Sequence, residues 1–466
     1  MAMTAGQVCG ERFKYSTSCY YIYQPTGAGD WYRWRLITRA QINTAGATVD
    51  DTYFCLAGCT RGKVYAGAQK LASQSDANSG WVSASTTRSV ASLYTTTVTH
   101  YRDFNLPAGM THVRPFLRSV STYGDMRIEA YEDTTLLSSK DYDGYVDLDC
   151  CYEGDWFELP AGTTKVRVMK PVDDGKVSIF AGLDFINITS EVDPDSAGSV
   201  MYYTYDDPAA TVLKPAFWGA SLYPAPSTTE LCIEWADTGG AYSGSKAVGG
   251  IGHQGINTAT IAWATQSGTG APATWTAAVG DKIAADYLIM SIVTAKAYQE
   301  SAQTNWRGTL TGKLVFDGSG CVIDHQVAVN QLTNMDVFTM YIAQCTVPDT
   351  LTHTLFHGEE SVRRFTGTEV APQVKTPRIE AWGGPPATHY TIECLEIDTH
   401  AAYFQKVAAS GLPRWVHGTG YYKAYMNYYY NTSAAMDLDN GSSIGTRFAI
   451  RLKDRKLTHK HIVRSF

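Results

Sequence analysis

The sequence predicts an all-β protein, and three observations support this fold class. Between residues 309 and 345, apolar residues alternate with polar residues in three runs, the first two of which are separated by Gly318-Ser319-Gly320. A period of two that is broken by a Gly-rich turn is typical of antiparallel strands with one face in a core. Similar runs recur along the chain, and one short strand-turn-strand segment occurs twice. We therefore expect tandem β-sandwich or jelly-roll modules and a larger C-terminal antiparallel β-sandwich.

The first module is predicted at residues 1–95. Its strand-like runs lie at 18–24, 31–38, 51–58 and 63–69, and the turns between them are rich in Pro, Gly and Asp. Turn residues of these types between β-prone runs indicate an all-β module. We expect this N-terminal β module to serve for attachment.

The second module is predicted at residues 96–192, because it contains an internal repeat. The segment 104–114 (FNLPAGMTHVR) recurs fifty-three residues later at 157–167 (FELPAGTTKVR). Each copy reads as a strand that ends in a Pro-Gly turn, followed by a new strand that opens with Val-Arg. Two copies are too few for a solenoid. They predict two equivalent halves of one β-sandwich of the jelly-roll kind.

The rest of the chain is predicted to be a linker and a large domain. Residues 193–213 gather Asp, Pro, Ser and Gly without a consistent period, which indicates a connector. Residues 214–466 contain many alternating runs and read as a large C-terminal β-sandwich that ends in a basic tail. Within it, the segment 400–410 is the best helix candidate, since Gly411 and Pro413 follow it.

Composition excludes several classes of protein. The formal net charge is -7 and only 18% of residues are charged, so no basic footprint for nucleic acid is present. No run of eighteen apolar residues occurs, so we expect no membrane insertion. The N-terminus lacks a basic region followed by an apolar core, which predicts synthesis in a cytoplasm without a signal peptide.

The ten cysteines do not follow a metal-binding pattern. No CxxC motif occurs, so a zinc site is not expected. Several cysteines alternate with core residues, as Cys321 and Cys394 do. Buried, reduced thiols explain this arrangement better than a framework of disulfides.

Two short glycine motifs carry no chemistry in their context. The segment 250–255 matches GxGxxG, but an alternating run follows it where a dinucleotide site needs a helix. The segment 441–445 matches GxSxG, but a strand-like run follows it where a nucleophile elbow also needs a helix. We interpret the first as a flexible loop and the second as a chance match.

An acidic loop between the two repeat copies is the one candidate metal site. It holds four carboxylates within nine residues, and Gly144 lies among them: Asp141, Asp143, Asp147 and Asp149. A hard cation such as Ca²⁺ takes clustered oxygen ligands, and a glycine allows the chain to wrap around it. The alternative is an exposed acidic loop that binds nothing. Ca²⁺ is the one cofactor that the sequence suggests.

Histidines concentrate in the C-terminal half, where nine of the eleven lie beyond residue 250. A lyase acting on an acidic polysaccharide needs a base, an acid and a cation that neutralises the uronate carboxylate. The residues with which to test such a reaction are His357, Arg363, His417 and Tyr421. No spacing fixes them together, so we favour a binding function. In such a function, flat aromatic rings stack on sugars, and the candidates are Trp415, Tyr421, Tyr422 and Tyr425.

The repeated Leu-Pro-Ala-Gly segment and the run GTLTGKLVFD resemble the virion adhesion proteins of tailed bacteriophages, namely tail fibres, tailspikes and head fibres. The resemblance implies a chain of β-sandwich modules located in the virion, contacts with other virion proteins and a homotrimer. It transfers no functional residue, because no family motif matches position by position.

Two hypotheses follow from the sequence. In the first, the protein is a structural virion protein, a fibre or surface appendage, whose partner is a polysaccharide of the host surface. In the second, the C-terminal domain is a polysaccharide lyase or hydrolase and the repeat domain is an accessory sugar-binding domain. The lack of a catalytic motif favours the first.

Overall fold

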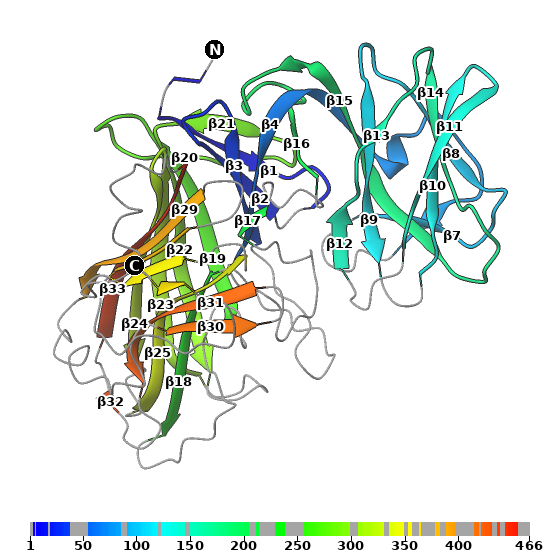
Figure 1. Cartoon of the computed structure of the whole chain (residues 1–466). Coiled ribbons are helices and arrows are strands. Elements are labelled where there is room, and N and C mark those ends of the chain that lie inside the picture. The colour runs from blue at the N-terminus through cyan, green and yellow to red at the C-terminus, as the bar shows by residue number, and fades with distance from the viewer. Residues whose placement is uncertain are drawn as a thin grey trace.

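The computed structural model describes a chain built from β-strands (Figure 1). It describes the backbone at residues 3–4, 6–16, 19–37, 55–84, 91–119, 123–144, 150–204, 211–213, 229–237, 256–298, 306–329, 335–348, 353–356, 363–364, 378–382, 388–397, 414–418, 421–430, 436–438 and 443–454. Side chains are described at 3–4, 6–16, 19–36, 59–84, 91–118, 123–144, 152–204, 262–291, 312–322 and 449–452. Across these parts of the chain, regular structure is entirely β apart from one 3₁₀ turn, η1 (Ala72–Gln74). The predicted all-β class is confirmed there; the helix predicted at 400–410 lies outside the described residues.

A β-sandwich lies at one end of the molecule, at the right of Figure 1. Its outer layer is a five-stranded antiparallel sheet with the order β11-β10-β14-β8-β5. These strands are β5 (Ala77–Asn78), β8 (Tyr101–Asn105), β10 (Met126–Glu132), β11 (Thr135–Tyr142) and β14 (Lys165–Met169). The facing layer contains β6 (Val82–Ser83), β7 (Leu93–Thr95), β9 (His112–Ser119), β12 (Cys150–Glu153), β13 (Phe157–Glu158) and β15 (Ser178–Glu191).

The core of the sandwich is the apolar layer between these two sheets. In β10, Met126, Ile128 and Ala130 point inward and are buried, while Arg127 and Tyr131 alternate with them. Inward residues of the facing sheet, such as Phe180, complete one apolar cluster, whose members run from Ala72 of η1 to Phe185 of β15. The boundary that the sequence predicts at residue 95 falls within this span.

The repeat builds the sandwich with an approximate two-fold symmetry. Each copy crosses from one sheet to the other: the first leaves β8 and enters β9, and the second leaves β13 and enters β14. The copies then pair with each other. Phe104 lies opposite Val166 in the outer sheet, and its equivalent Phe157 lies opposite Val113 in the facing sheet.

The two crossing turns also match in their hydrogen bonds. The amide of Leu106 donates to the carbonyl of Thr164 at 2.8 Å, and the equivalent amide of Leu159 donates to the carbonyl of Thr111 at the same distance. The glycines of the two turns have φ values of 78° and 88°. Glycine adopts this left-handed conformation without steric cost. The repeated Pro-Ala-Gly segment therefore forms the turn by which the chain passes from one sheet to the other.

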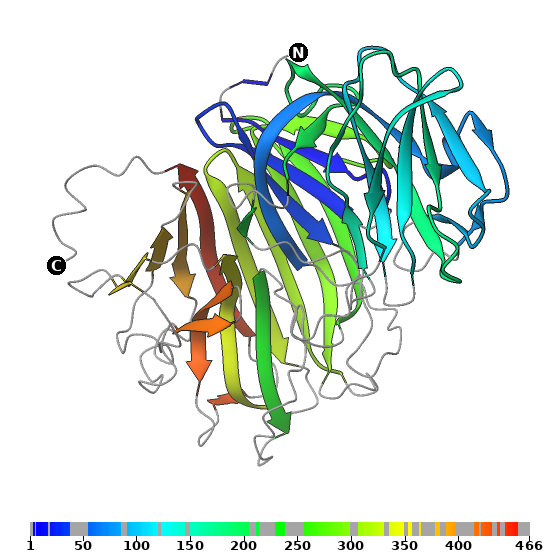
Figure 2. The same cartoon turned by 45° about the vertical axis from the view of Figure 1, so that its right-hand side comes forward.

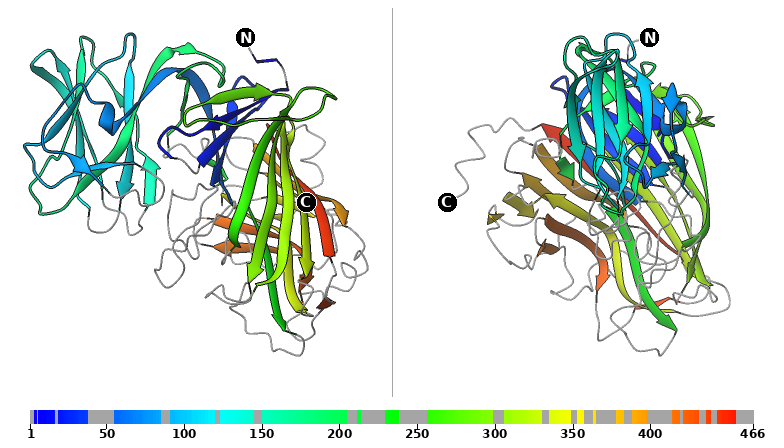
Figure 3. Two further views of the ribbon diagram at one scale, coloured as in Figure 1. Left: turned by 180° about the vertical axis from the view of Figure 1, so that it is seen from behind. Right: turned by 90° about the vertical axis from the view of Figure 1, so that its right-hand side faces the viewer.

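The N-terminal strands lie between the sandwich and the C-terminal half (Figure 3). They are β1 (Val8–Arg12), β2 (Cys19–Pro25) and β3 (Trp31–Ile37). The long strand β4 (Cys55–Leu71) pairs with β3 along its first part and with β15 along its last part, so it belongs to both the N-terminal sheet and the sandwich. The predicted linker 193–213 contains β16 (Val200–Tyr202) and β17 (Thr211–Leu213), which also pair with β4.

The described strands of the C-terminal half, several of them long, belong to two sheets (Figure 2). One sheet has ten strands in the order β20-β19-β22-β23-β24-β33-β29-β28-β26-β27. Their bounds are β19 (Ile256–Gln266), β20 (Ala273–Thr274), β22 (Tyr287–Tyr298), β23 (Trp306–Asp317), β24 (Gly320–Val329), β26 (His353–Phe356), β27 (Arg363–Arg364), β28 (Arg378–Trp382), β29 (Thr388–Ile397) and β33 (Ser443–Asp454).

The other strands of this half extend the N-terminal sheet. They are β18 (Thr229–Asp237), β21 (Lys282–Ala285), β25 (Met335–Pro348), β30 (Arg414–Gly418), β31 (Tyr421–Tyr430) and β32 (Met436–Leu438). The sequence predicts one meander from residue 309 to 345, and its first hairpin, β23–β24, is confirmed. The third strand is a correction: β25 pairs with β18 and β31. Its alternation predicts a strand but does not encode which sheet receives it.

Several local predictions are confirmed. Strands β19 and β33 follow the two glycine motifs, as the sequence indicates. Cys9, Cys19 and Cys59 are buried free thiols, and Cys321 is buried as well. Burial raises the pKa of Cys9, Cys19 and Cys59 well above the ordinary thiol value, so these side chains behave as small apolar groups.

Candidate functional site

The four aromatic residues predicted to bind a glycan all lie on one hairpin. In β30–β31, His417 lies opposite Tyr422, Trp415 lies opposite Ala424, and Gly418 lies opposite Tyr421. Successive residues of a strand occupy opposite faces, so Trp415, His417 and Tyr422 hold register positions on one face. Tyr421 and Tyr425 hold positions on the other face, and this divides the predicted set in two.

The residues named for a lyase are distributed over two sheets. Arg363 belongs to β27 of the ten-stranded sheet, where it lies opposite Thr354, while His417 and Tyr421 belong to the other sheet. His357 lies outside the described residues. His417 and Tyr421 therefore lie on two paired strands of one hairpin, and Arg363 lies on a strand of the other sheet.

The predicted calcium loop is described in part. The Asp141 carboxylate accepts two hydrogen bonds from Arg127, at 2.6 and 2.8 Å, and Asp143 is exposed. The hydrogen bond from Arg127 lowers the pKa of Asp141. Asp147 and Asp149 lie outside the described residues. Across the described positions, no three His, Cys, Asp or Glu side chains gather closely enough to hold a metal ion, and Ca²⁺ binding stays a prediction.

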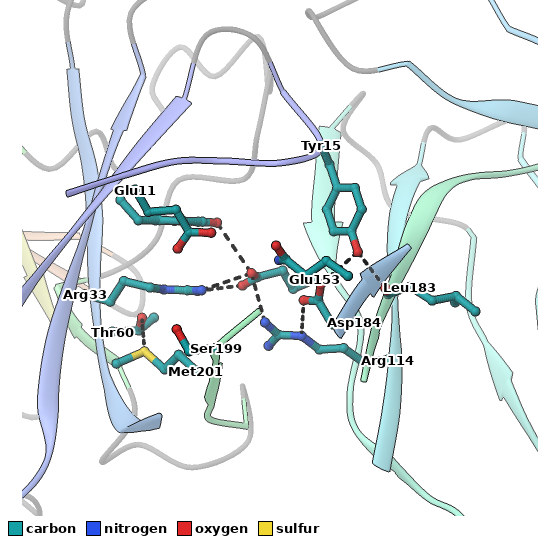
Figure 4. Close-up of polar contacts among 12 residues, drawn as sticks. Glu11, Tyr15, Arg33, Thr60, Arg114, Glu153, Leu183, Asp184, Ser199 and Met201 are labelled. Atoms are coloured by element: carbon teal, nitrogen blue, oxygen red, sulfur yellow. Dashed lines mark hydrogen bonds and ion pairs between the residues drawn. The ribbon is translucent and has the colours of Figure 1, made fainter. Parts of the chain in front are cut away.

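A buried network of charges joins the sandwich to the N-terminal sheet (Figure 4). Arg33 of β3 donates two hydrogen bonds to Glu153 of β12, at 3.1 and 2.7 Å. Arg114 of β9 donates to Glu153 and to Asp184 of β15, both at 3.0 Å, and the Tyr15 hydroxyl lies 2.8 Å from Asp184. All these side chains are at least nine-tenths buried. Charge-assisted hydrogen bonds of this geometry are among the strong ones.

The network controls the ionisation of its members. Burial disfavours the charged form of Glu153, but the guanidinium groups of Arg114 and Arg33 outweigh it and hold the pKa of this carboxyl below its usual value. Burial, and next the adjacent Asp184 carboxylate, raise the pKa of Tyr15 well above the ordinary tyrosine value. The network is therefore a set of fixed ion pairs with a neutral phenol, which suits a structural junction.

The outer sheet of the sandwich carries a related cluster on its outward face. This face lies on the side of the sandwich away from β1–β3, as Figures 1 and 3 show. Arg167 of β14 donates two hydrogen bonds to Asp103 of β8, at 2.7 and 2.9 Å. Its guanidinium carbon lies 4.0 Å from the centre of the Tyr101 ring and 5.2 Å from that of Tyr131. We call the outward face of this sheet the open face; its central cluster is Tyr101, Asp103, Glu129, Tyr131, Lys165 and Arg167.

The register of the strands explains this cluster. Arg167 lies directly between Glu129 of β10 and Asp103 of β8, and its neighbour on the same face, Lys165, lies opposite Tyr131. The Tyr131 hydroxyl donates to Glu129 at 2.6 Å. Burial, and then this hydrogen bond, raise the pKa of Tyr131 to about 12. The result is a layer of two phenol rings and a guanidinium, held by hydrogen bonds to the carboxylates of Asp103 and Glu129.

The open face and the buried network are equivalent under the symmetry of the repeat. Arg114 and Arg167 end the two copies at matching positions, and Asp184 and Glu129 are their matching cross-strand neighbours. Arg114 is 1% exposed, because the N-terminal sheet covers it, while Arg167 is 25% exposed. The chain thus buries one copy of the surface and leaves the other in solvent.

Sequence reasoning missed this open face. The repeat was interpreted as an element of architecture, and the recognition residues were sought in the histidine-rich C-terminal half, where the segment 420–430 holds six tyrosines. The signal was present in the Val-Arg that ends each copy and in the alternation of DMRIEAY (125–131). That alternation places Arg127, Glu129 and Tyr131 on one side of a strand.

Comparisons with known proteins give a distant likeness. No family model matches the chain, and no curated protein matches it. Among solved structures, it is similar to the GH36 alpha-galactosidases AgaA and AgaB from Geobacillus stearothermophilus. For AgaA the identity is 13% and the TM-score 0.30, over 49% of this chain and 30% of that one. For AgaB the values are 12% and 0.30, over 52% and 32%.

A variant of AgaA in complex with stachyose is 12% identical with a TM-score of 0.31, over 74% of this chain and 41% of that one. The chain thus spans less than half the length of these enzymes. A likeness of this size assigns neither a fold family nor a function. No helix in the described residues is long and apolar enough to cross a membrane.

Proposed function

We propose that this protein is a non-enzymatic β-sandwich protein that binds a glycan through the open face of its outer sheet. One observation carries the proposal: the partly exposed side chains of Tyr101, Arg167 and Tyr131 pack against one another on the sandwich surface farthest from the rest of the chain. Flat rings with a polar edge suit sugars, because the ring face contacts C–H groups while the edge binds hydroxyls.

The polar groups of the open face fit the same ligand. Asp103 and Glu129 accept hydrogen bonds, and Lys165 and Arg167 donate them. Their positions are fixed by mutual pairing, as the distances of 2.7 and 2.9 Å between Arg167 and Asp103 indicate. A binding site gains affinity when its groups are held in place before the ligand arrives. The open face is such a preorganised surface.

The biological setting that we propose is the surface of a virus particle. There the protein would be a fibre or surface appendage, in a homotrimer with contacts to other virion proteins, and its ligand a polysaccharide of the host surface. The proposal rests on the tandem β modules and on the resemblance to phage adhesion proteins. Immunogold electron microscopy of virus particles tests it: label on the particles supports a virion protein, and label confined to soluble protein rejects it.

The binding proposal is tested by a glycan array probed with the full chain. The strongest ligand is then titrated calorimetrically into wild type, Tyr101→Ala and Tyr131→Ala. Each substitution removes one ring of the layer and is expected to weaken binding about five-fold or more. The matched control is Tyr94→Ala, because Tyr94 is a partly exposed tyrosine on β7 of the facing sheet. This variant is expected to bind as wild type does.

The enzymatic alternative is separated in the same samples. Incubation of the full chain with acidic and neutral polysaccharides is followed by assays for unsaturated products and for new reducing ends. We expect neither. Product that depends on His417 or Tyr421 would overturn the proposal in favour of a lyase or hydrolase.

A further inference from the structure

We infer that the open face takes a neutral glycan and discriminates against uronate and other anionic sugars. This inference rests on the proposed function and specifies its ligand. The lyase hypothesis, by contrast, implies an acidic polysaccharide as the ligand.

The first reason is that the cations of the open face already have carboxylate partners. Arg167 binds Asp103 through two hydrogen bonds, and the Lys165 ammonium lies 3.5 Å from the same carboxylate. At the edge of the sheet, Arg127 binds Asp141 through two hydrogen bonds. Recognition of an anionic sugar would require one of these cations either to leave a formed pair or to bind a second carboxylate beside the first.

The second reason is the balance of charge. Among the described side chains of this face, three cations and three carboxylates lie together: Arg127, Lys165, Arg167, Asp103, Glu129 and Asp141. Asp103 and Glu129 are 6% and 7% exposed, so water screens them poorly. A ligand carboxylate placed over Arg167 would approach both of these fixed anions. Juxtaposed like charges select against the wrong partner.

The third reason is the phenol of Tyr131. Its proton is engaged by Glu129 at 2.6 Å, and the phenol stays neutral at physiological pH. A sugar hydroxyl can donate to its oxygen, whereas a ligand carboxylate has no proton to give. Neutral hydroxyls, which both donate and accept, match the mixed donors and acceptors of this face.

The symmetry-related buried surface around Arg114 shows what an arginine at this position needs in order to bind a second carboxylate. Arg114 binds two carboxylates, Asp184 and Glu153, because a second arginine, Arg33, supplies additional positive charge. On the open face, the equivalent Arg167 shares its single bonded carboxylate with Lys165. The cluster around Arg167 is therefore complete without an additional anion.

The experiment compares neutral, uronate-containing and sialylated oligosaccharides of equal length by calorimetric titration of the full chain at low and high sodium chloride. We expect the neutral oligosaccharide to bind at least about ten-fold more tightly than its uronate counterpart, and we expect its dissociation constant to depend little on the sodium chloride concentration. Lys165→Gln keeps a hydrogen-bond donor and removes the charge, so it is expected to weaken neutral and uronate binding by a similar factor and to leave the preference for the neutral oligosaccharide in place. Asp103→Asn removes one of the fixed anions, so it is expected to improve uronate binding and to reduce the preference for the neutral oligosaccharide.

The contrary outcomes are distinct. Equal or tighter uronate binding that weakens with salt and is lost in Lys165→Gln would overturn the neutral ligand and leave glycan binding standing. No binding of any glycan would overturn both proposals. If Arg167→Ala changes the oligomeric state in light scattering and leaves glycan binding unchanged, the open face is an interface between copies of this chain, and the inference fails.

Discussion

Arg114 and Arg167 occupy equivalent positions in the two copies of the repeat, yet one is 1% exposed and the other 25% exposed. Both lie in antiparallel sheets beside a cross-strand carboxylate, and both guanidinium groups lie over aromatic rings. The difference arises because the N-terminal sheet covers the first copy. One sequence motif thus serves a structural junction in one copy and, in our proposal, a binding surface in the other.

This pair gives the first prediction. Arg114→Ala leaves Glu153 and Asp184 buried with a lost partner, which typically costs about 3–5 kcal/mol. Arg167→Ala removes a partly exposed ion pair and is expected to cost about 1 kcal/mol or less. Urea unfolding of both variants measures the difference. Equal destabilisation by the two substitutions would contradict the assignment of separate roles.

The second prediction concerns acid. The pKa of Glu153 in the folded state lies below its value in the unfolded chain. Its contribution to stability is therefore complete above the unfolded value of about 4.3, and it is lost as the pH falls through the folded pKa. We expect the free energy of unfolding to fall more steeply below that value in wild type than in Glu153→Gln.

Urea unfolding at a series of pH values measures this slope. At neutral pH, Glu153→Gln is expected to be less stable than wild type, because Arg33 and Arg114 lose a charged partner. Identical pH profiles in the two proteins would show that another carboxylate governs the acid transition.

The third prediction tests the contact between the N-terminal sheet and the ten-stranded sheet. The buried Gln24 amide donates to the carbonyls of Asp317 and Gly320 at the β23–β24 turn, and its oxygen accepts the Trp34 indole N–H. Gln24→Ala leaves these groups unsatisfied and is expected to cost about 1–3 kcal/mol. Thermal unfolding checks this value, with Gln266→Ala as the control, because its bond to Gly268 lies on the surface. An unchanged melting temperature would exclude this contact.

The fourth prediction concerns a buried lysine. The Lys170 ammonium is fully buried and contacts the carbonyl of Lys176 at 2.7 Å, the carbonyl of Thr96 at 3.3 Å and Asp174 at 2.8 Å. Lys170→Met keeps the length of the side chain but removes the donors, at an expected cost of about 1–3 kcal/mol. Denaturant unfolding measures it. A variant as stable as wild type would mean that water replaces the ammonium.

The sequence predicted local structure better than connections between sheets. Alternation located β23, β24 and β25, and the repeat located one sandwich built from two halves. The alternation of apolar and polar residues does not determine which strands a strand pairs with. The pairing of β25 with β18 and β31, in the other sheet, was therefore not predicted. Strand β4 was not foreseen as shared between sheets either, because its seventeen residues read as two shorter runs.

The candidate site was missed for a related reason. Recognition residues were sought where aromatic residues are dense in the sequence, as in the segment 420–430. The open face takes its aromatic residues from two strands that are distant in sequence, with Tyr101 on β8 and Tyr131 on β10. Only the pairing of both strands with β14 brings them to either side of Arg167.

Hydrogen–deuterium exchange of the full chain, with and without its strongest glycan ligand, tests the central claim most directly. We predict protection on binding in β8, β10 and β14 and unchanged exchange in the hairpin β30–β31. Protection confined to the hairpin that holds Trp415 and Tyr422, with no change in the outer sheet, would contradict a binding site on the open face.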